Sequence, residues 1–314
     1  MNKRMRVASF FLVLVVFSVV ALKKMGCCSC CASNIACRSS FFDQEGAVVR
    51  PLEELLELLE IEHDGTLDSV VGATQKEWLR PAGKERWEVE SRHEEKREQI
   101  MPLLEQLGCV HELLPSQKNY MYGIVLGALV SRVRTRFAFL IEQWKKGVRF
   151  EELVFFGGQR PLHSELESAE ILFDLNNKDL PFSPDWQLQG EIPKTEAQMM
   201  RMVFDQADLP EDFKKQVRVT VVDAPMQKKS DGTLRRPNTN DTVQEWLRTN
   251  PKPGTCLLSS NQPYAGRQHS VACTILPETF VVETIGAAAQ NDLPIVIYLD
   301  TLARWLYQER KRRA

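Results

Sequence analysis

From residue 116 onward, short apolar runs alternate with longer segments in which apolar residues recur with a helical period. The apolar runs predict strands at 120–126, 153–156, 217–222, 256–258 and 280–283. The helical spacing predicts helices at 131–146, 164–176, 195–207, 241–249, 263–275 and 294–311. This alternation is typical of an α/β domain with a mostly parallel sheet that helices cover on both faces.

Residues 41–115 have a different pattern, with 18 acidic and 8 basic residues, and predict an acidic helical segment. One predicted helix begins at Pro51, since proline suits the first position of a helix. Its apolar stripe consists of Leu52, Leu55, Leu56 and Leu59. This stripe is expected to pack against a neighbouring domain or a protein partner. Residues 85–105 predict a second, solvated surface helix.

Residues 8–22 form an unbroken run of apolar or small residues, with three basic residues before it and Lys23 and Lys24 after it. The run is longer than most secretory signals and shorter than most spanning helices. Because lysines stand where a cleavage site is expected, we predict a retained membrane anchor. The basic residues before the run, with the amino terminus, outnumber those after it, which predicts that the amino terminus lies inside and the bulk of the chain on the exported side of the membrane.

Five of the eight cysteines lie in a stretch of eleven residues that follows this segment, at Cys27, Cys28, Cys30, Cys31 and Cys37. We interpret them as membrane-proximal thiols that are acylated or joined by disulfides. Gly26-Cys27 also fits a lipoprotein junction, although Lys24 stands where such sites prefer leucine. The spacing is too tight for zinc, so no metal site is predicted. Cys109, Cys256 and Cys273 are expected in the core.

The composition, 43% hydrophobic and 26% charged, is that of a folded globular protein, and the net charge of −2 gives no indication of nucleic-acid binding. In parallel sheets, ligands bind beyond the carboxyl ends of the strands. Gly127-Ala128 and Gly157-Gly158 follow the first two predicted strands, where glycines expose backbone N–H groups to a ligand or simply form a tight turn.

Arg132, Arg134 and Arg136 occupy the first two turns of the helix expected at 131–146, which Ser131 is expected to cap. Cations there oppose the helix dipole by up to about 1 kcal/mol each, unless they meet an anion. They therefore indicate an anionic ligand or, alternatively, ion pairs with the acidic segment 41–115.

Polar residues begin three further helices. Thr195 and Gln198 form a capping box, and Glu196 between them is either a favourable charge at the helix start or a catalytic base. Asn238, Thr239, Asn240 and Asp241 are more polar residues than one helix cap needs. Ser260 and Arg267 place a donor and a cation after the fourth predicted strand, and His269 reads as a packed or solvated residue.

Taken in order, Gly127-Ala128 with Arg132, Gly157-Gly158, Thr195-Glu196-Ala197, Asn238-Thr239 and Ser260 to Arg267 resemble the ElyC/SanA/YdcF family over about residues 118–285. The resemblance implies a Rossmann-like α/β/α domain at 116–314, often membrane-anchored on the exported side and linked to cell-envelope or peptidoglycan maintenance. Two positions depart from the family: Tyr264 stands where histidine is usual, and Thr242 where asparagine is common. Residues 162–193 look like an insertion, which we expect to lie as a lid over the site.

We therefore expect an anchored domain that binds a phosphorylated or nucleotide-like anion in one cleft, with Glu196 as the candidate base. The expected ligand-binding residues are Gly127, Ala128, Arg132, Gly157, Gly158, Asn238, Thr239, Ser260 and Arg267. No Walker loop indicates a cofactor, and the sequence leaves open whether the protein is an enzyme. The alternative is a non-catalytic scaffold at the membrane, in which the acidic segment and the basic carboxyl-terminal residues recruit partners.

Overall fold

The computed structural model describes residues 41–43 and 45–313. The predicted anchor at 8–22 and the cysteine cluster at 27–37 lie outside this range. Among the helices that the structure describes, none combines the length and apolarity that crossing a bilayer requires.

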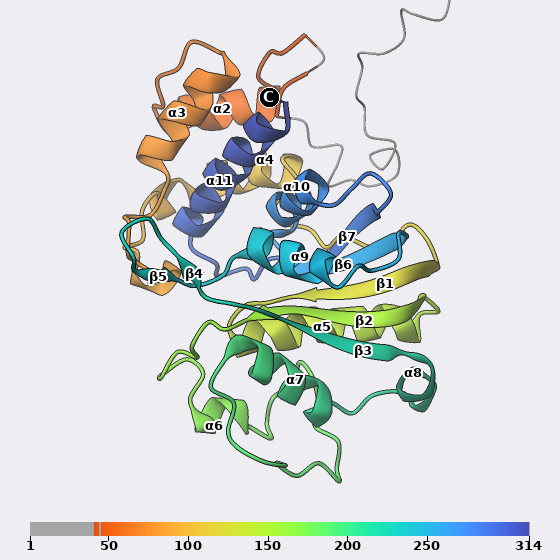
Figure 1. Ribbon diagram of the computed structural model, residues 1–314. Helices are drawn as coiled ribbons and strands as arrows, with labels where there is room; N and C mark the ends of the chain where they lie inside the picture. Colours follow the sequence, from red (N-terminus) through yellow and green to blue (C-terminus); the bar gives the residue numbers. More distant parts are fainter. Residues whose placement is uncertain (1–40, 44, 314) are drawn as a thin grey trace, which may run out of the picture.

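Five strands form one parallel sheet at the centre of the molecule (Figure 1). They are β1 (Asn119–Leu126), β2 (Arg149–Gly158), β3 (Arg218–Ala224), β6 (Thr255–Asn261) and β7 (Val281–Ala287), in the order β3-β2-β1-β6-β7. The predicted parallel sheet is confirmed. β2, β6 and β7 run several residues longer than predicted, because β2 pairs with β3 as far as Gly158 and β6 pairs with β7 as far as Asn261 and Ala287.

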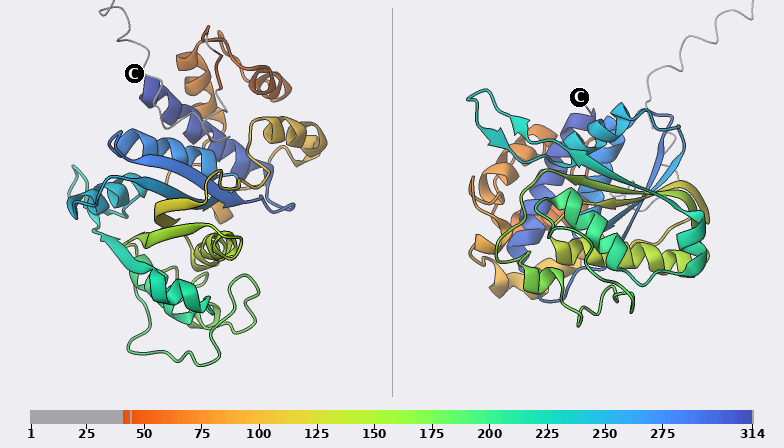
Figure 2. Two further views of the ribbon diagram at one scale, coloured as in Figure 1. Left: turned by 90° about the vertical axis from the view of Figure 1, so that its right-hand side faces the viewer. Right: turned by 60° about the horizontal axis from the view of Figure 1, so that its bottom comes forward.

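Helices cover both faces of the sheet, which makes a three-layer α/β/α arrangement (Figure 2). On one face lie α5 (Val130–Lys145) and α7 (Glu196–Gln206), packed on side chains such as Leu153 and Phe155. On the other face lie α9 (Thr239–Arg248) and α10 (Ala265–Ile275), packed on Val154 and Phe156. Successive residues of β2 thus point into opposite cores, as expected for a strand buried on both sides.

A further helical layer covers α10. It contains α2 (Arg50–Leu58), α3 (Leu67–Glu77), α4 (Arg97–Gln106) and the carboxyl-terminal α11 (Ile295–Arg313). The predicted leucine stripe of α2 is buried in the core that these helices share, so within the described chain its neighbour is another part of the same molecule. The short helices η2 (Arg86–Glu88) and η3 (Glu94–Lys96) connect α3 to α4.

The helix predicted at 85–105 is only partly present. His93 has a left-handed backbone (φ 66°), which a continuous right-handed helix excludes, and α4 begins only at Arg97. This shorter helix also buries Ile100, Leu103 and Leu104 and is therefore no merely solvated surface element.

The helix predicted at 164–176 is reduced to a single turn, α6 (Ala169–Leu172). The carbonyl of Leu172 accepts hydrogen bonds from the side chains of Arg134 and Gln206. In a longer helix, this carbonyl would instead accept the backbone N–H of a residue in the next turn. The following chain to residue 195 is largely irregular and forms the green loop below α7 in the left view of Figure 2. The short helix α8 (Glu211–Gln216) precedes β3, and a hairpin of β4 (Gln227–Lys228) and β5 (Leu234–Arg235) precedes α9.

Candidate functional site

The strand order reverses direction beside β1, since the chain runs from β1 outward to β3 and then returns to β6 on the other side. In parallel sheets this switch point is where ligands bind. A cavity of about 780 Å³ lies there. Seven of the residues predicted for the site line it, namely Gly127, Ala128, Arg132, Glu196, Asn238, Thr239 and Arg267.

Three other predicted residues do not line this cavity. A side chain at Gly157 would lie 2.9 Å from the Cα atom of Ala197, and one at Gly158 would lie 2.5 Å from Pro237. These glycines therefore let α7 and the chain before α9 approach β2, which is a packing reason for glycine at both positions. Ser260 is buried within β6, where its hydroxyl donates a hydrogen bond to Gln268.

Gly127 has a structural reason for being glycine that also shapes the cavity. A Cβ atom there would lie 2.7 Å from the carbonyl oxygen of Phe156 and 2.8 Å from Cδ of Glu196. The missing side chain thus allows the Glu196 carboxyl group to reach the end of β1. The helix that follows begins at Val130 with Leu129 as its cap residue, so the predicted cap at Ser131 is wrong.

The three arginines of α5 divide into two groups. Arg134 and Arg136 are buried and donate to backbone carbonyls, Arg134 to Ile171 and Leu172, and Arg136 to Leu126 and Gly127. Their task is structural, which corrects the expectation that they meet an anionic ligand or the acidic segment.

Arg132 is different, because it lines the cavity and makes no hydrogen bond or ion pair with any other residue that the structure describes. Of the three cations at the start of α5, it is therefore the one that is placed to receive an anion.

Glu167 compensates for the cations at the start of α5. Its fully buried carboxylate accepts from the backbone N–H of Val130, at 3.1 Å, and from that of His163, at 2.8 Å. It also receives two bonds from Arg160, at 2.7 and 2.9 Å. An acid at a helix start is favourable, so Glu167 stabilises α5 and fixes the start of the insertion against the cavity wall.

Glu196 begins α7 and lines the cavity, and Thr195 caps the helix with Gln198 as predicted. Its Oε1 lies 3.3 Å from Nε of Arg160. Burial raises the pKa of Glu196, the ion pair with Arg160 opposes this, and the nearby negative charge of Glu167 adds to the rise. A carboxyl group with a raised pKa at the wall of a cavity can hold a proton and return it, as a general acid or base requires.

The four polar residues at 238–241 are largely explained by the helix they begin. Asn238 is the cap residue of α9 and accepts from the N–H groups of Asn240 and Asp241, while Asp241 accepts from the N–H of Asn238. The carboxylate of Asp241 also holds Arg235. The surplus of polar groups that suggested a functional role is therefore a capping box with an added ion pair, and only Asn238 and Thr239 of the four line the cavity.

Arg267 lines the cavity from α10 without a hydrogen bond or ion pair to the described part of the chain. Burial, with the nearby charge of Arg86, lowers its pKa to about 10, so the guanidinium is still ionised at neutral pH. Tyr264 also lines the cavity, and the centre of its ring lies 4.4 Å from the guanidinium carbon of Arg86.

The cavity is strongly electropositive. Six arginines and two glutamates line it. Arg236 is paired with Glu85 and Arg160 with Glu196, which leaves four arginines without an acidic partner in the lining: Arg86, Arg132, Arg136 and Arg267. Arg136 is satisfied by carbonyl groups, and the other three remain available to a ligand.

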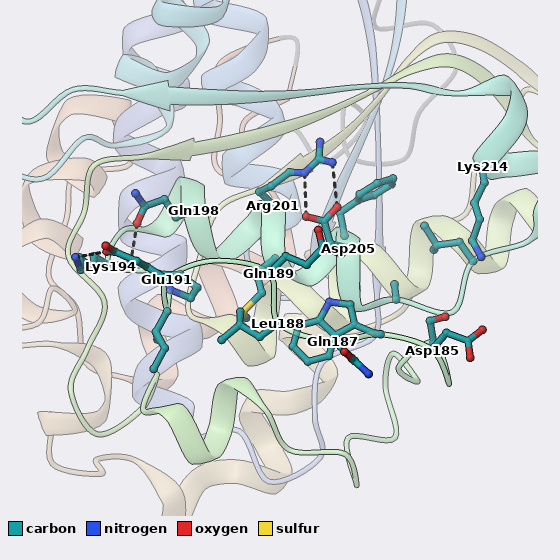
Figure 3. A pocket seen from close by; sticks show the side chains of 18 residues that line it. Asp185, Gln187, Leu188, Gln189, Glu191, Lys194, Gln198, Arg201, Asp205 and Lys214 are labelled. Carbon is teal, nitrogen blue, oxygen red and sulfur yellow. Dashed lines mark hydrogen bonds and ion pairs between the residues drawn. The ribbon is translucent and has the colours of Figure 1, made fainter.

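A second cavity, of about 790 Å³, lies between α7 and the loop at 183–194 and has the opposite character (Figure 3). Four of its charged side chains pair with one another: Lys194 bonds Glu191 at 2.6 Å, and Arg201 bonds Asp205 at 3.0 Å. This cavity therefore presents no unsatisfied charge to a ligand at those positions.

Sequence reasoning missed Arg86, Arg160 and Glu167 as parts of the site. Arg160 directly follows Gly-Gly-Gln, which could have drawn attention to it, whereas nothing in the local pattern marks the other two. For metals, no group of three or more suitable ligands occurs within residues 41–43 and 45–313. Comparison with known proteins finds no matching family model, no matching curated protein and no matching solved structure.

Proposed function

We propose that the cavity at the carboxyl ends of β1 and β6 binds a phosphorylated or nucleotide-like anion. The observation that carries the proposal is that Arg132 and Arg267, from helices on opposite faces of the sheet, both line the cavity and have no partner in the described chain. Unpaired guanidinium groups in a partly desolvated site are costly unless an anion satisfies them. Arginine also binds phosphate oxygens in a bidentate manner.

Glu196 is the candidate catalytic group of this site. Its raised pKa and its place in the cavity wall suit proton transfer to or from a bound phosphate ester, in hydrolysis or in group transfer. Arg160 and Glu167 would act as positioning residues, since both are held by the network described above and Arg160 contacts the carboxyl group directly.

The cellular setting of the proposal comes from the sequence. The apolar run at 8–22 supports a membrane anchor, and its flanking charges support an exported location for the folded part. With the resemblance to the ElyC/SanA/YdcF family, this supports a role in maintenance of the bacterial cell envelope.

The proposal is tested by measuring thermal unfolding of the full-length chain, in a non-ionic detergent, with increasing inorganic phosphate. Binding to the folded state alone stabilises it by about 2.7 kcal/mol at a phosphate concentration of one hundred times Kd. The double variant Arg132→Gln and Arg267→Gln should lose this stabilisation. A matched variant, Arg218→Gln and Arg248→Gln, removes two surface arginines that pair with Glu152 and Glu245 and should retain it.

Two results would count against the proposal. One is wild-type protein whose unfolding does not respond to phosphate at all. The other is a response that the Arg132 and Arg267 variant keeps in full. Either result would favour the alternative of a non-catalytic scaffold at the membrane.

A further inference from the structure

We infer that Arg86 and Arg267 form a second anionic subsite beside that of Arg132, and that the ligand therefore carries a diphosphate group rather than a single phosphate. This inference rests on the proposed function, because it specifies the ligand of the same cavity. Arg86 comes from the acidic segment, far from the strand ends that sequence reasoning pointed to.

Arg86 is held in place by its neighbours, while its own charge is left unsatisfied. Its Nε atom is buried and has no hydrogen-bond partner, and its guanidinium lies over the ring of Tyr264. The residue before it, Glu85, forms an ion pair of 2.8 Å with Arg236, which joins η2 to the chain between β5 and α9. The backbone that carries Arg86 is thus fixed at the cavity by groups other than Arg86 itself.

Arg86 and Arg267 repel each other and share no counter-ion. Both side chains line the cavity, and Arg86 lies over the ring of Tyr264, which stands at the start of α10 three residues before Arg267. The charge of Arg86 also contributes to the lowered pKa of Arg267. The acid near Arg267 is Asp300, but Arg304 bonds that carboxylate at 3.0 Å and Arg80 lies 3.6 Å from it. Two like charges without a counter-ion, both lining one cavity, define a place for an anion.

Arg132 enters the same cavity from α5, on the opposite face of the sheet from α10, which carries Arg267. Arg136, one turn further along α5, is fixed by the carbonyls of Leu126 and Gly127 at the end of β1 and has a structural role. Burial, with the charges of Arg132 and Arg86, lowers the pKa of Arg136 to about 9. Arg132 from one face of the sheet and Arg267 with Arg86 from the other therefore present positive charge to the cavity.

The charge balance fits a diphosphate. When Glu196 is ionised, Glu85 and Glu196 in the lining and the buried Glu167 beside Arg160 balance three of the six lining arginines, which leaves three positive charges. A phosphate monoester carries about 1.5 to 2 negative charges at neutral pH, so it would leave part of the excess unbalanced. A diphosphate ester, with about three, would balance it, with one phosphoryl group at Arg132 and the other at Arg86 and Arg267.

The test compares inorganic pyrophosphate with inorganic phosphate by calorimetric titration of the full-length protein in a non-ionic detergent. We expect pyrophosphate to bind at least tenfold more tightly than phosphate. Arg86→Gln should lower pyrophosphate affinity by about tenfold or more, the usual effect of losing a hydrogen bond to a charged group. The matched control is Arg92→Gln, which removes the same charge from an exposed position six residues along the same connection.

The possible results separate this inference from the proposed function. Equal affinity for both anions, or equal losses in the Arg86 and Arg92 variants, would overturn the diphosphate subsite and leave the phosphate site intact. Binding of neither anion by the wild-type protein would overturn both proposals. If Arg86→Gln does not fold, Arg86→Lys keeps the charge without the bidentate geometry, and an unchanged preference for pyrophosphate in that variant would contradict bidentate binding by Arg86.

Discussion

Replacing Glu167 by alanine tests how the segment 162–193 is attached to the candidate site. The carboxylate is fully buried and accepts four hydrogen bonds, two from Arg160 and one each from the N–H groups of Val130 and His163. The substitution removes all four bonds at once. It also leaves Arg160 with Glu196 as its remaining acidic neighbour.

The expected loss is large because a buried charge loses its main partner. Breaking a buried ion pair by removing one member typically costs about 3–5 kcal/mol, since the other charge stays desolvated. The contact between Arg160 and Glu196, at 3.3 Å, offsets part of that cost. We therefore expect the free energy of unfolding to fall by about 3 kcal/mol, with a smaller loss for Glu167→Gln, which keeps the shape of the side chain.

Equilibrium unfolding in urea at pH 7 measures this loss. If the free energy of unfolding falls with urea concentration as steeply as in the wild-type protein, the folded state is intact. Glu165→Ala is the matched control, because Glu165 is an exposed acid two residues away, and it should change stability by less than about 0.5 kcal/mol. A loss below about 1 kcal/mol for Glu167→Ala would refute the claim that this carboxylate fixes the insertion to the start of α5.

Two further predictions concern pH. Because burial raises the pKa of Glu196, its neutral form persists to higher pH than in a free carboxyl group, so phosphate affinity should fall as the pH rises through that pKa. In calorimetric titrations, Glu196→Gln should bind phosphate more tightly than the wild-type protein and with less dependence on pH. A pH profile of phosphate affinity that the substitution leaves unchanged would contradict this. Burial lowers the pKa of His269 to about 4, so the folded state binds a proton at this residue less readily than the unfolded state. The stability linked to neutral His269 is therefore fully present above about pH 6.5 and is lost as the pH falls toward 4, by about 3 kcal/mol in all. In urea unfolding at several pH values, His269→Gln should reduce this acid sensitivity, whereas replacing the exposed His111 should not. If the free energy of unfolding depends on pH equally in both variants, His269 does not remain neutral in the fold.

The sequence predicts well those features whose cause is local. The five strands, the capping box at Thr195 and the leucine stripe of α2 follow from the spacing of apolar and polar residues alone. The short helix α6 could not be predicted in this way, because groups from α5 and α7 end it by bonding its last carbonyls.

The composition of the site depends on contacts between distant residues and could be predicted only in part. Seven residues were placed in the cavity because ligand sites follow the ends of parallel strands. Gly157 and Gly158 do not line the cavity, and the sequence could not show this because a glycine that permits helix packing has the same sequence signature as one that contacts a ligand. Arg86 was missed because it lies in a charge-rich segment, where an arginine is usually only solvated.

The most direct test of the central claim is a crystal structure of the protein soaked with tungstate, a phosphate analogue whose anomalous scattering locates it without ambiguity. The account predicts a tungstate ion in the cavity at the ends of β1 and β6, with oxygens within about 3.2 Å of the guanidinium groups of Arg132 or Arg267. Tungstate bound only at other surfaces, with this cavity empty, would contradict it.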